Sequence, residues 1–205
     1  MKTLVLDAMG VIYKVGDDVG ELLCPFIHEN GGLSDDSEIE TIYREASLGH
    51  LSAREFWERV KINPALEDDY LLRHQLSDGL LDFLPQARQR FASIWCLSND
   101  VSEWSRKLRE RFGLTQYFDG FVISGDVRLR KPDTAIYERL IEQAHAKASD
   151  MILVDDREPN LDSAAGLGFG TVLFGFAQGT SRTHEAAANF SDLLKNISRR
   201  EETQK

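Results

Sequence analysis

The stretch Thr3-Leu4-Val5-Leu6-Asp7, continued by Ala8-Met9-Gly10-Val11, decides the fold of this chain. A short apolar, β-rich run that ends in a carboxylate and is followed by a glycine predicts a buried parallel strand. Its last residue is then expected at the carboxyl edge of the sheet, where open α/β sheets bind their ligands. A carboxylate there can act as a nucleophile in phosphoryl transfer. Taken by itself, Asp7 fits equally well an acid that only caps the following turn.

Later apolar runs repeat this pattern of a strand followed by polar side chains. The runs and the residues after them are Ser93–Leu97 with Ser98, Asn99 and Asp100, Phe121–Asp126 with Arg130, Lys131, Pro132 and Asp133, and Met151–Val154 with Asp155 and Asp156. Helical patterns separate the runs. The alternation predicts a parallel sheet with helices on both faces. A nucleophile, a hydroxyl, a lysine and a carboxylate pair are therefore expected along one edge.

In these segments the chain resembles the haloacid dehalogenase (HAD) superfamily of hydrolases that form an aspartyl-phosphate. The resemblance runs from Lys2 to about Phe176 and includes the continuation 157–168. The positions that match the motifs are Asp7 with Gly10 and Val11, Ser98 with Asn99, Lys131 with Pro132, and Asp155 with Asp156 after Val154. Met9 departs from the pattern, because most phosphatases of the superfamily carry a second Asp at that position.

The resemblance implies a role for each matched residue. Asp7 is expected to be the nucleophile. Ser98 and Asn99 are expected to bind the substrate, and Lys131 to bind it and to neutralise charge on Asp7 and on the transferring group. The resemblance also implies Mg²⁺, a hard cation that prefers oxygen ligands. The expected metal ligands are Asp7, the main-chain carbonyl of Met9 and Asp155, with Asp156 orienting the water shell of the metal.

With Met at position 9, no residue is evident that could act as the acid or base in the proton transfers of phosphoryl transfer. A thioether cannot protonate a leaving group or activate water, and general acid–base help is typically worth about 10²–10⁴-fold. Three explanations stay open. The substrate has an acidic leaving group that departs without a proton, such as a sugar 1-phosphate or an acyl phosphate, or another residue, from the cap or the loop 13–18, transfers the proton. In the third explanation, turnover is slow and the chain is a binding or regulatory protein. The first is favoured, because a branch similar to this chain, which hydrolyses sugar 1-phosphates, also lacks the second Asp.

Two other branches of the superfamily lack that Asp as well. Haloacid dehalogenases attack carbon through the same Asp without metal, and they do not need the pair Asp155-Asp156, which argues against this reaction here. Phosphonate-cleaving members use a cap lysine that forms a Schiff base. Lys61 is the candidate in this chain, but its Lys-Ile-Asn-Pro context is typical of a helix end.

The segment between the first strand and Leu80 predicts a small helical cap inserted into a Rossmann-like α/β core. Helical patterns cover 18–29, 37–48, 52–60 and 67–75; Ser52 and Glu55 match a capping box, and Phe56, Trp57 and Val60 are expected in a hydrophobic core. The expected division is 1–13 and 80–198 for the core, with a fifth strand at Gly170–Phe174, 14–79 for the cap, and 199–205 for a solvated tail. In the cap, Arg44, His50 and Arg54 are candidate substrate contacts.

Composition narrows the classes of partner. A chain of 205 residues suits one α/β core with an insertion. Its net charge of −10 argues against a nucleic-acid backbone as partner. Cys24 and Cys96 have no metal-ligand spacing and predict reduced thiols in a cytoplasmic protein. Neither a signal-peptide pattern nor a membrane-span run is recognised. The expected partner is a small phosphorylated metabolite, and the expected state is a monomer or homodimer.

Overall fold

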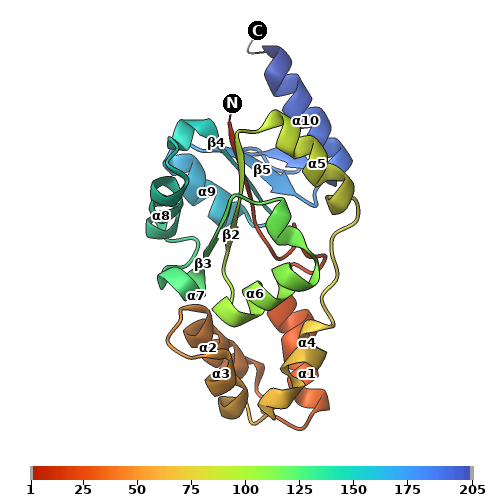
Figure 1. Cartoon of the computed structure of the whole chain (residues 1–205), viewed down its shortest axis with the longest axis vertical. Coiled ribbons are helices and arrows are strands. Elements are labelled where there is room, and N and C mark those ends of the chain that lie inside the picture. The colour runs from red at the N-terminus through yellow and green to blue at the C-terminus, as the bar shows by residue number, and fades with distance from the viewer. Residues whose placement is uncertain (1, 204–205) are drawn as a thin grey trace.

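A parallel sheet forms the centre of the protein. The computed structural model describes residues 2–203, with side chains described for 2–199. The sheet has six strands in the order β3-β2-β1-β4-β5-β6 (Figure 1). The strands are β1 (Thr3–Leu6), β2 (Ser93–Ser98), β3 (Gly120–Ile123), β4 (Met151–Asp155), β5 (Gly170–Phe174) and β6 (Glu185–Ala187). All neighbouring strands pair in parallel. The predicted α/β Rossmann-like fold is therefore confirmed.

Helices cover both faces of the sheet. The helices on one face are α5 (Leu80–Arg90), α6 (Ser102–Arg111) and α10 (Phe190–Thr203), and those on the other are α8 (Thr134–Ala144) and α9 (Glu158–Gly166). Successive side chains of a strand point to opposite faces. Leu4 and Leu6 accordingly pack in the buried cluster that contains Phe83 of α5, whereas Val5 packs with Tyr137 of α8. In Figure 1, α8 and α9 lie to the left of the sheet and α5 and α10 to its right.

The strand register brings the chemistry-bearing residues together at one edge. Leu6 of β1 pairs with Cys96 of β2 on one side and with Val154 of β4 on the other. The next residue, Asp7, therefore lies between the carboxyl ends of these two strands, and its main-chain N–H donates to the carbonyl oxygen of Val154 at 2.9 Å. The ends of β1, β2 and β4 meet at this edge because parallel strands all finish on the same side.

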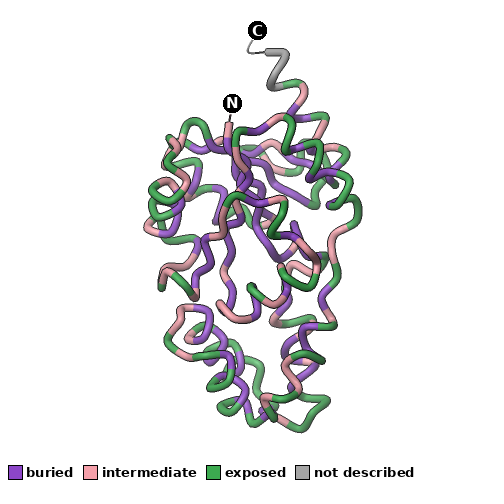
Figure 2. Tube along the Cα trace, viewed as in Figure 1, coloured by how far each residue is buried: buried purple, intermediate pink, exposed green. Residues whose placement is uncertain are grey.

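A group of short helices lies beyond that edge and forms the cap (Figure 1). They are η1 (Val19–Leu23, a π-helical turn), α1 (Cys24–Glu29), α2 (Asp36–Ser47), α3 (Ala53–Arg59), η2 (Pro64–Leu66) and α4 (Glu67–Leu71). Figure 2 shows that their outer turns are exposed while their inner faces are buried. The predicted capping box between Ser52 and Glu55 is present at the start of α3.

Aromatic rings join the cap to the α/β core. Phe56 and Trp57 of α3 and Tyr70 of α4 each pack against Trp104 of α6, with ring centroids 5.1–5.3 Å apart. The indole N–H groups of Trp57 and Trp104 both donate to Glu67 Oε2, at 2.9 and 3.0 Å. The burial expected for the aromatic pair of α3 is therefore confirmed, and this burial fixes the cap onto the core.

A second contact between cap and core depends on a glycine. Gly49 follows α2 with φ of +69°, and a Cβ atom there would lie 2.2 Å from the main-chain oxygen of Gly125. Gly125 belongs to the short helix α7 (Ser124–Val127). The hydroxyl of Ser124 donates to the main-chain oxygen of Ser47, at the end of α2. Backbone therefore meets backbone where the cap approaches the end of β3.

Some elements differ from the sequence-based expectations. The helix expected over 67–75 ends at Leu71, and the run expected to be a strand through Asp126 turns into α7 after Ile123. The last strand, β6, was not anticipated. Helix α10 continues through Thr203 into the expected tail, of which residues 204–205 lie outside the described part. The turns η3 (Leu114–Gln116) and η4 (Ala148–Asp150) complete the elements. Within residues 2–203, no helix has the length and apolarity needed to cross a bilayer.

Candidate active site

A buried lysine links two of the acids at the sheet edge. Lys131 Nζ lies 2.7 Å from Asp7 Oδ1 and 2.7 Å from Asp155 Oδ2. Asp155 is fully buried and also accepts hydrogen bonds from the side-chain amide of Asn160 (3.0 Å) and the main-chain N–H of Arg157 (2.9 Å). Burial opposes a charge on Lys131, but Asp155 and Asp7 hold its pKa above the usual value. Lys131 is therefore a fixed cation beside Asp7.

A third acid completes the group. Asp7, Asp155 and Asp156 each offer a carboxylate oxygen, and these oxygens lie within 4.8 Å of one another. Within the described residues, the buried Oδ1 of Asp156 has no hydrogen-bond partner. Burial and then the charge of Asp155 raise the pKa of Asp7 to about 7, and the same causes raise that of Asp156. Converging carboxylates with an unpaired oxygen fit a hard divalent cation, which would offset their repulsion.

Ser98 and Asn99, at the end of β2, have different surroundings. Ser98 Oγ is buried and has no hydrogen-bond partner among the described residues. The Asn99 side chain, in contrast, accepts from the main-chain N–H of Lys131 at 2.8 Å and donates to its carbonyl oxygen at 3.0 Å. Ser98 thus has a free donor beside Asp7, whereas the amide of Asn99 holds the backbone that carries Lys131.

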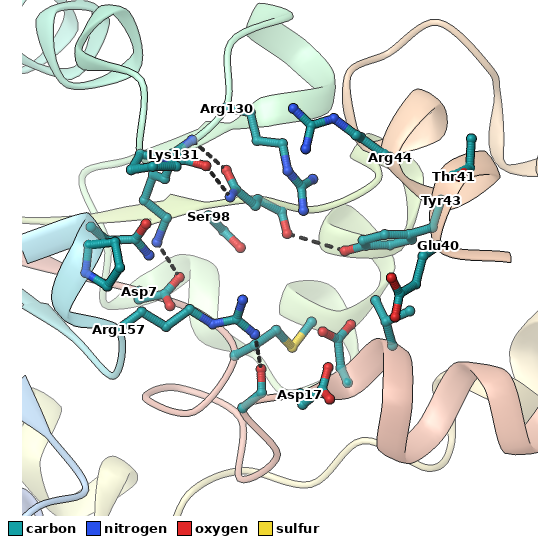
Figure 3. A pocket seen from close by; sticks show the side chains of 18 of the residues that line it. Asp7, Asp17, Glu40, Thr41, Tyr43, Arg44, Ser98, Arg130, Lys131 and Arg157 are labelled. Carbon is teal, nitrogen blue, oxygen red and sulfur yellow. Dashed lines mark hydrogen bonds and ion pairs between the residues drawn. The ribbon is translucent and has the colours of Figure 1, made fainter. Parts of the chain in front are cut away.

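A cavity of about 650 Å³ lies between the sheet edge and the cap (Figure 3). The predicted site residues that line it are Asp7, Met9, Ser98, Asn99, Lys131 and Arg44. Asp17 and Asp18, from the loop 13–18 that the sequence offered as one source of a proton-transfer residue, also line it. Further lining residues that sequence reasoning did not assign to the site include Glu40, Thr41, Tyr43, Arg130, Arg157 and Asn160. Figure 3 shows Arg44 and Arg130 on one side of the Tyr43 ring and Glu40 and Asp17 toward the other.

Two cap residues proposed from the sequence are engaged elsewhere. His50 pairs with Glu45 at 3.0 Å, and Arg54 pairs with Glu58 at 3.0 Å. Neither belongs to the described lining of the cavity. The sequence positions of His50 and Arg54, near a turn and a helix start, do not show in which direction their side chains point. Only the packing of the cap decides which faces of its helices meet the cavity.

The loop after Met9 folds back onto the acid group. Gly10 N–H donates to the main-chain oxygen of Val15 at 3.0 Å, and Arg157 donates to the main-chain oxygen of Gly16 at 3.2 Å. Gly16 lies so close to the acids that a Cβ atom there would be 2.5 Å from Asp156 Oδ2. The site therefore tolerates only glycine at this position without moving the Asp156 carboxylate.

Gly16→Ala should lower activity far more than stability. The added methyl must displace Asp156 Oδ2, and a displacement of about 1 Å in an active site can cost roughly 10²-fold in rate. Steady-state kinetics and thermal unfolding measure the two effects. Gly166→Ala, at the end of α9, is the matched control because a Cβ atom there meets nothing within 4 Å. Equal activity in both variants would contradict the expected displacement.

The sequence matches the family of haloacid dehalogenase-like hydrolases over residues 1–168. The chain belongs to this family. The family assignment agrees with the predicted motifs around Asp7, Ser98, Lys131 and Asp155, all of which fall inside the matched region.

This HAD-like hydrolase is similar to curated enzymes that include phosphatases and a dehalogenase. It is 23% identical to the ribulose-1,5-bisphosphate 5-phosphatase of Halopiger xanaduensis, over 77% of this chain and 66% of the relative. It is 24% identical to (S)-2-haloacid dehalogenase 1 of a Pseudomonas strain, over 84% of this chain and 83% of the relative. A sesquiterpene phosphatase of Aspergillus oryzae is 27% identical over 43% of this chain, which spans 45% of that relative.

Solved structures share the fold. A HAD-family enzyme of Bacteroides thetaiotaomicron, solved as a magnesium complex, superposes with a TM-score of 0.74 and 19% identity over 89% of this chain and 96% of the other. At this level of identity the likeness concerns the fold. It agrees with the HAD-like arrangement of sheet and cap described above.

Proposed function

We propose that this HAD-like hydrolase is a Mg²⁺-dependent phosphatase that forms an aspartyl-phosphate on Asp7. The observation that carries the proposal is the pairing of Asp7 with Lys131 at 2.7 Å, together with the hydroxyl of Ser98, which has no partner among the described residues. A nucleophilic carboxylate, a fixed cation and a free donor are what an anionic phosphoryl group requires, since charge neutralisation supplies most of the catalysis. The curated phosphatase relatives support the same reaction class.

Each residue of the group has a defined task in this reaction. An oxygen of Asp7 attacks phosphorus, the bond to the leaving oxygen breaks, and the phosphoryl group is held on Asp7. Lys131 and Ser98 stabilise the charge on its oxygens. Mg²⁺, when bound by Asp7, Asp155 and the main-chain carbonyl of Met9, with Asp156 orienting its water shell, supplies positive charge to the transferring group. Water then releases phosphate and regenerates Asp7.

The similarity to a haloacid dehalogenase makes dehalogenation a second candidate reaction. Dehalogenation through Asp7 would replace a halide on carbon. The acids Asp7, Asp155 and Asp156 favour the phosphatase, because their convergence suits a cation that carbon–halogen cleavage does not need. A third reading, a catalytically weak binding or regulatory protein, predicts ligand binding without turnover.

The presence of Met instead of Asp at position 9 bears on the class of substrate. We propose a small metabolite with a readily departing oxygen, such as a sugar 1-phosphate. Met9 lines the cavity and is 7% exposed, and its thioether cannot donate a proton to a leaving group there. An anomeric oxygen departs more readily than a primary alkoxide, and it therefore depends less on a proton donor.

Glucose 1-phosphate should be hydrolysed faster than glucose 6-phosphate. The two substrates differ in the acidity of the leaving oxygen but share the sugar. Introducing Met9→Asp should help the 6-phosphate more, by up to about 10²–10⁴-fold, because it supplies the missing donor. The measurement is kcat/KM for both substrates with Mg²⁺. Equal values in the wild type, with chemistry limiting, would contradict the proposed dependence on the leaving group.

A further inference from the structure

An acidic leaving group removes the need for a proton donor only in the first half of the proposed reaction, the transfer of the phosphoryl group to Asp7. In the second half, water attacks the phosphoryl group on Asp7, and this step is the same for every substrate. The attacking water must lose a proton, and general-base help for such a transfer is typically worth about 10²–10⁴-fold. Met9 cannot accept the proton. The second step therefore requires a base from elsewhere in the cavity.

The loop from Met9 to η1 brings two acids, Asp17 and Asp18, to the cavity. Gly16 lies against the acid group, since a Cβ atom on it would be 2.5 Å from Asp156 Oδ2 and 3.6 Å from Gly10 Cα. Asp18 follows two residues later, so its Cα lies at most roughly 7 Å from that of Gly16. Asp18 lines the same cavity as Asp7 and Met9.

The surroundings of Asp18 differ from those of an ordinary helix-capping acid. Asp18 precedes η1, yet its side chain makes no capping hydrogen bond, and only 6% of the residue is exposed. The neighbouring residue Asp17 is exposed and accepts the N–H of Gly20 at 3.3 Å. Asp18 is thus a buried acid that lines the cavity and caps no helix, whereas Asp17 supports the start of the helix.

We propose that Asp18 is the general base that activates water for hydrolysis of the aspartyl-phosphate. This assignment rests on the phosphatase function proposed above. The water proton passes to the Asp18 carboxylate while the water oxygen forms a bond to phosphorus. The bond between phosphorus and Asp7 breaks, its electron pair returns to the Asp7 carboxylate, and inorganic phosphate leaves. Asp18 then returns its proton to solvent.

The charges around Asp18 suit this task. The groups that act on it are Arg157 after β4, Arg130 before Lys131, Asp17 beside it, Tyr43 on α2, Tyr70 on α4 and Asp100 after β2. Burial raises the pKa of Asp18 to about 7, although Arg157 opposes the rise. A carboxyl with a pKa near neutrality is present partly as a base and can release the proton again, which is the optimum for a general base.

The test isolates the second step by using p-nitrophenyl phosphate, whose leaving group needs no proton. Asp18→Asn should release about one equivalent of nitrophenolate per protein in a rapid burst, and then turn over about 10²–10⁴-fold more slowly than the wild type. Intact mass after acid quench should show the phosphoryl adduct accumulating in this variant. A merely structural role would slow both phases and leave no adduct. Asp18→Ser, smaller than Asn, should give the same burst.

Two further variants complete the design. Glu21→Gln removes one charge at an exposed position of η1, the helical turn that follows Asp18, and should behave as the wild type. The double variant Met9→Asp with Asp18→Asn should regain steady-state turnover and lose the burst, because Asp at position 9 supplies a base. Folded Asp18→Asn with wild-type turnover and no adduct would overturn the role of Asp18. A wild type that hydrolyses no phosphate ester would instead overturn the proposed function.

Discussion

Asp7→Asn should abolish phosphate-ester hydrolysis, with a loss of roughly 10⁴-fold or more, as expected for removal of a covalent nucleophile. A carboxamide oxygen is too weak a nucleophile to attack phosphorus. Among the described residues, no other carboxylate at the site has the position of Asp7 between the ends of β2 and β4. Turnover of p-nitrophenyl phosphate and of glucose 1-phosphate measures the loss.

The fold of the Asp7→Asn variant should remain intact. Its amide oxygen can still accept the N–H of Ala8, which is 2.7 Å from Asp7 Oδ1, and Lys131 keeps its bond to Asp155. Removing one of the converging acids also reduces their repulsion. Circular dichroism and thermal unfolding check this point. Asp150→Asn, at the exposed turn before the opposite end of β4, is the control with the same change of charge.

Binding of a phosphoryl mimic tests the same site independently of turnover. Beryllium trifluoride with Mg²⁺ should bind to wild-type Asp7, with its fluorines near Ser98 Oγ and Lys131 Nζ. The hydroxyl of Ser98, which has no partner in the described part of the chain, would then gain an acceptor. Binding of the mimic elsewhere, together with an active Asp7→Asn variant, would contradict covalent catalysis at Asp7.

The sequence predicted the sheet well where strands are long and apolar. Two runs contain only apolar or β-branched residues, Thr3–Leu6 and Met151–Val154. Their burial and their ends could therefore be predicted from the sequence. Strand β6 was missed because Glu185–Ala187 has only three residues and none of them favours strands. The helix expected to begin at Asp18 divides into a π-helical turn and α1, a difference that hydrophobic periodicity does not encode.

The site was predicted where it follows from the sheet, and only in part where it follows from the connecting segments and the cap. Asp7, Ser98 and Asp155 end neighbouring strands, so topology alone brings them together. Arg130 and Asp18, in contrast, reach the cavity from connecting segments, between α7 and α8 and between β1 and η1, whose course the strand pattern does not determine. A single sequence shows that these residues are charged, but it does not show which way they point. The same reason explains why Arg44 lines the cavity and His50 does not.

Removal of Mg²⁺ should have the second large effect: thorough treatment with EDTA should reduce hydrolysis to background, and added Mg²⁺ should restore it. The convergence of Asp7, Asp155 and Asp156, with Asp156 Oδ1 left without a described partner, is the basis of this expectation. Binding itself is measurable without turnover. Mg²⁺ at a hundredfold excess over its Kd should stabilise the fold by about 2.7 kcal/mol, which is roughly 5–10 °C in Tm.

Asp156→Asn separates metal binding from the other tasks of the site. The substitution leaves Lys131 on Asp7 and Asp155, because Asp156 takes no part in those ion pairs. It should raise the Mg²⁺ concentration needed for half-maximal activity by about 10–100-fold, as is typical for residues that orient a metal or its water, and it should weaken the thermal shift in parallel. Full activity in EDTA, with no shift of Tm by Mg²⁺, would overturn the metal dependence. Release of halide from a 2-haloacid by that same metal-free protein would establish the dehalogenase reaction instead.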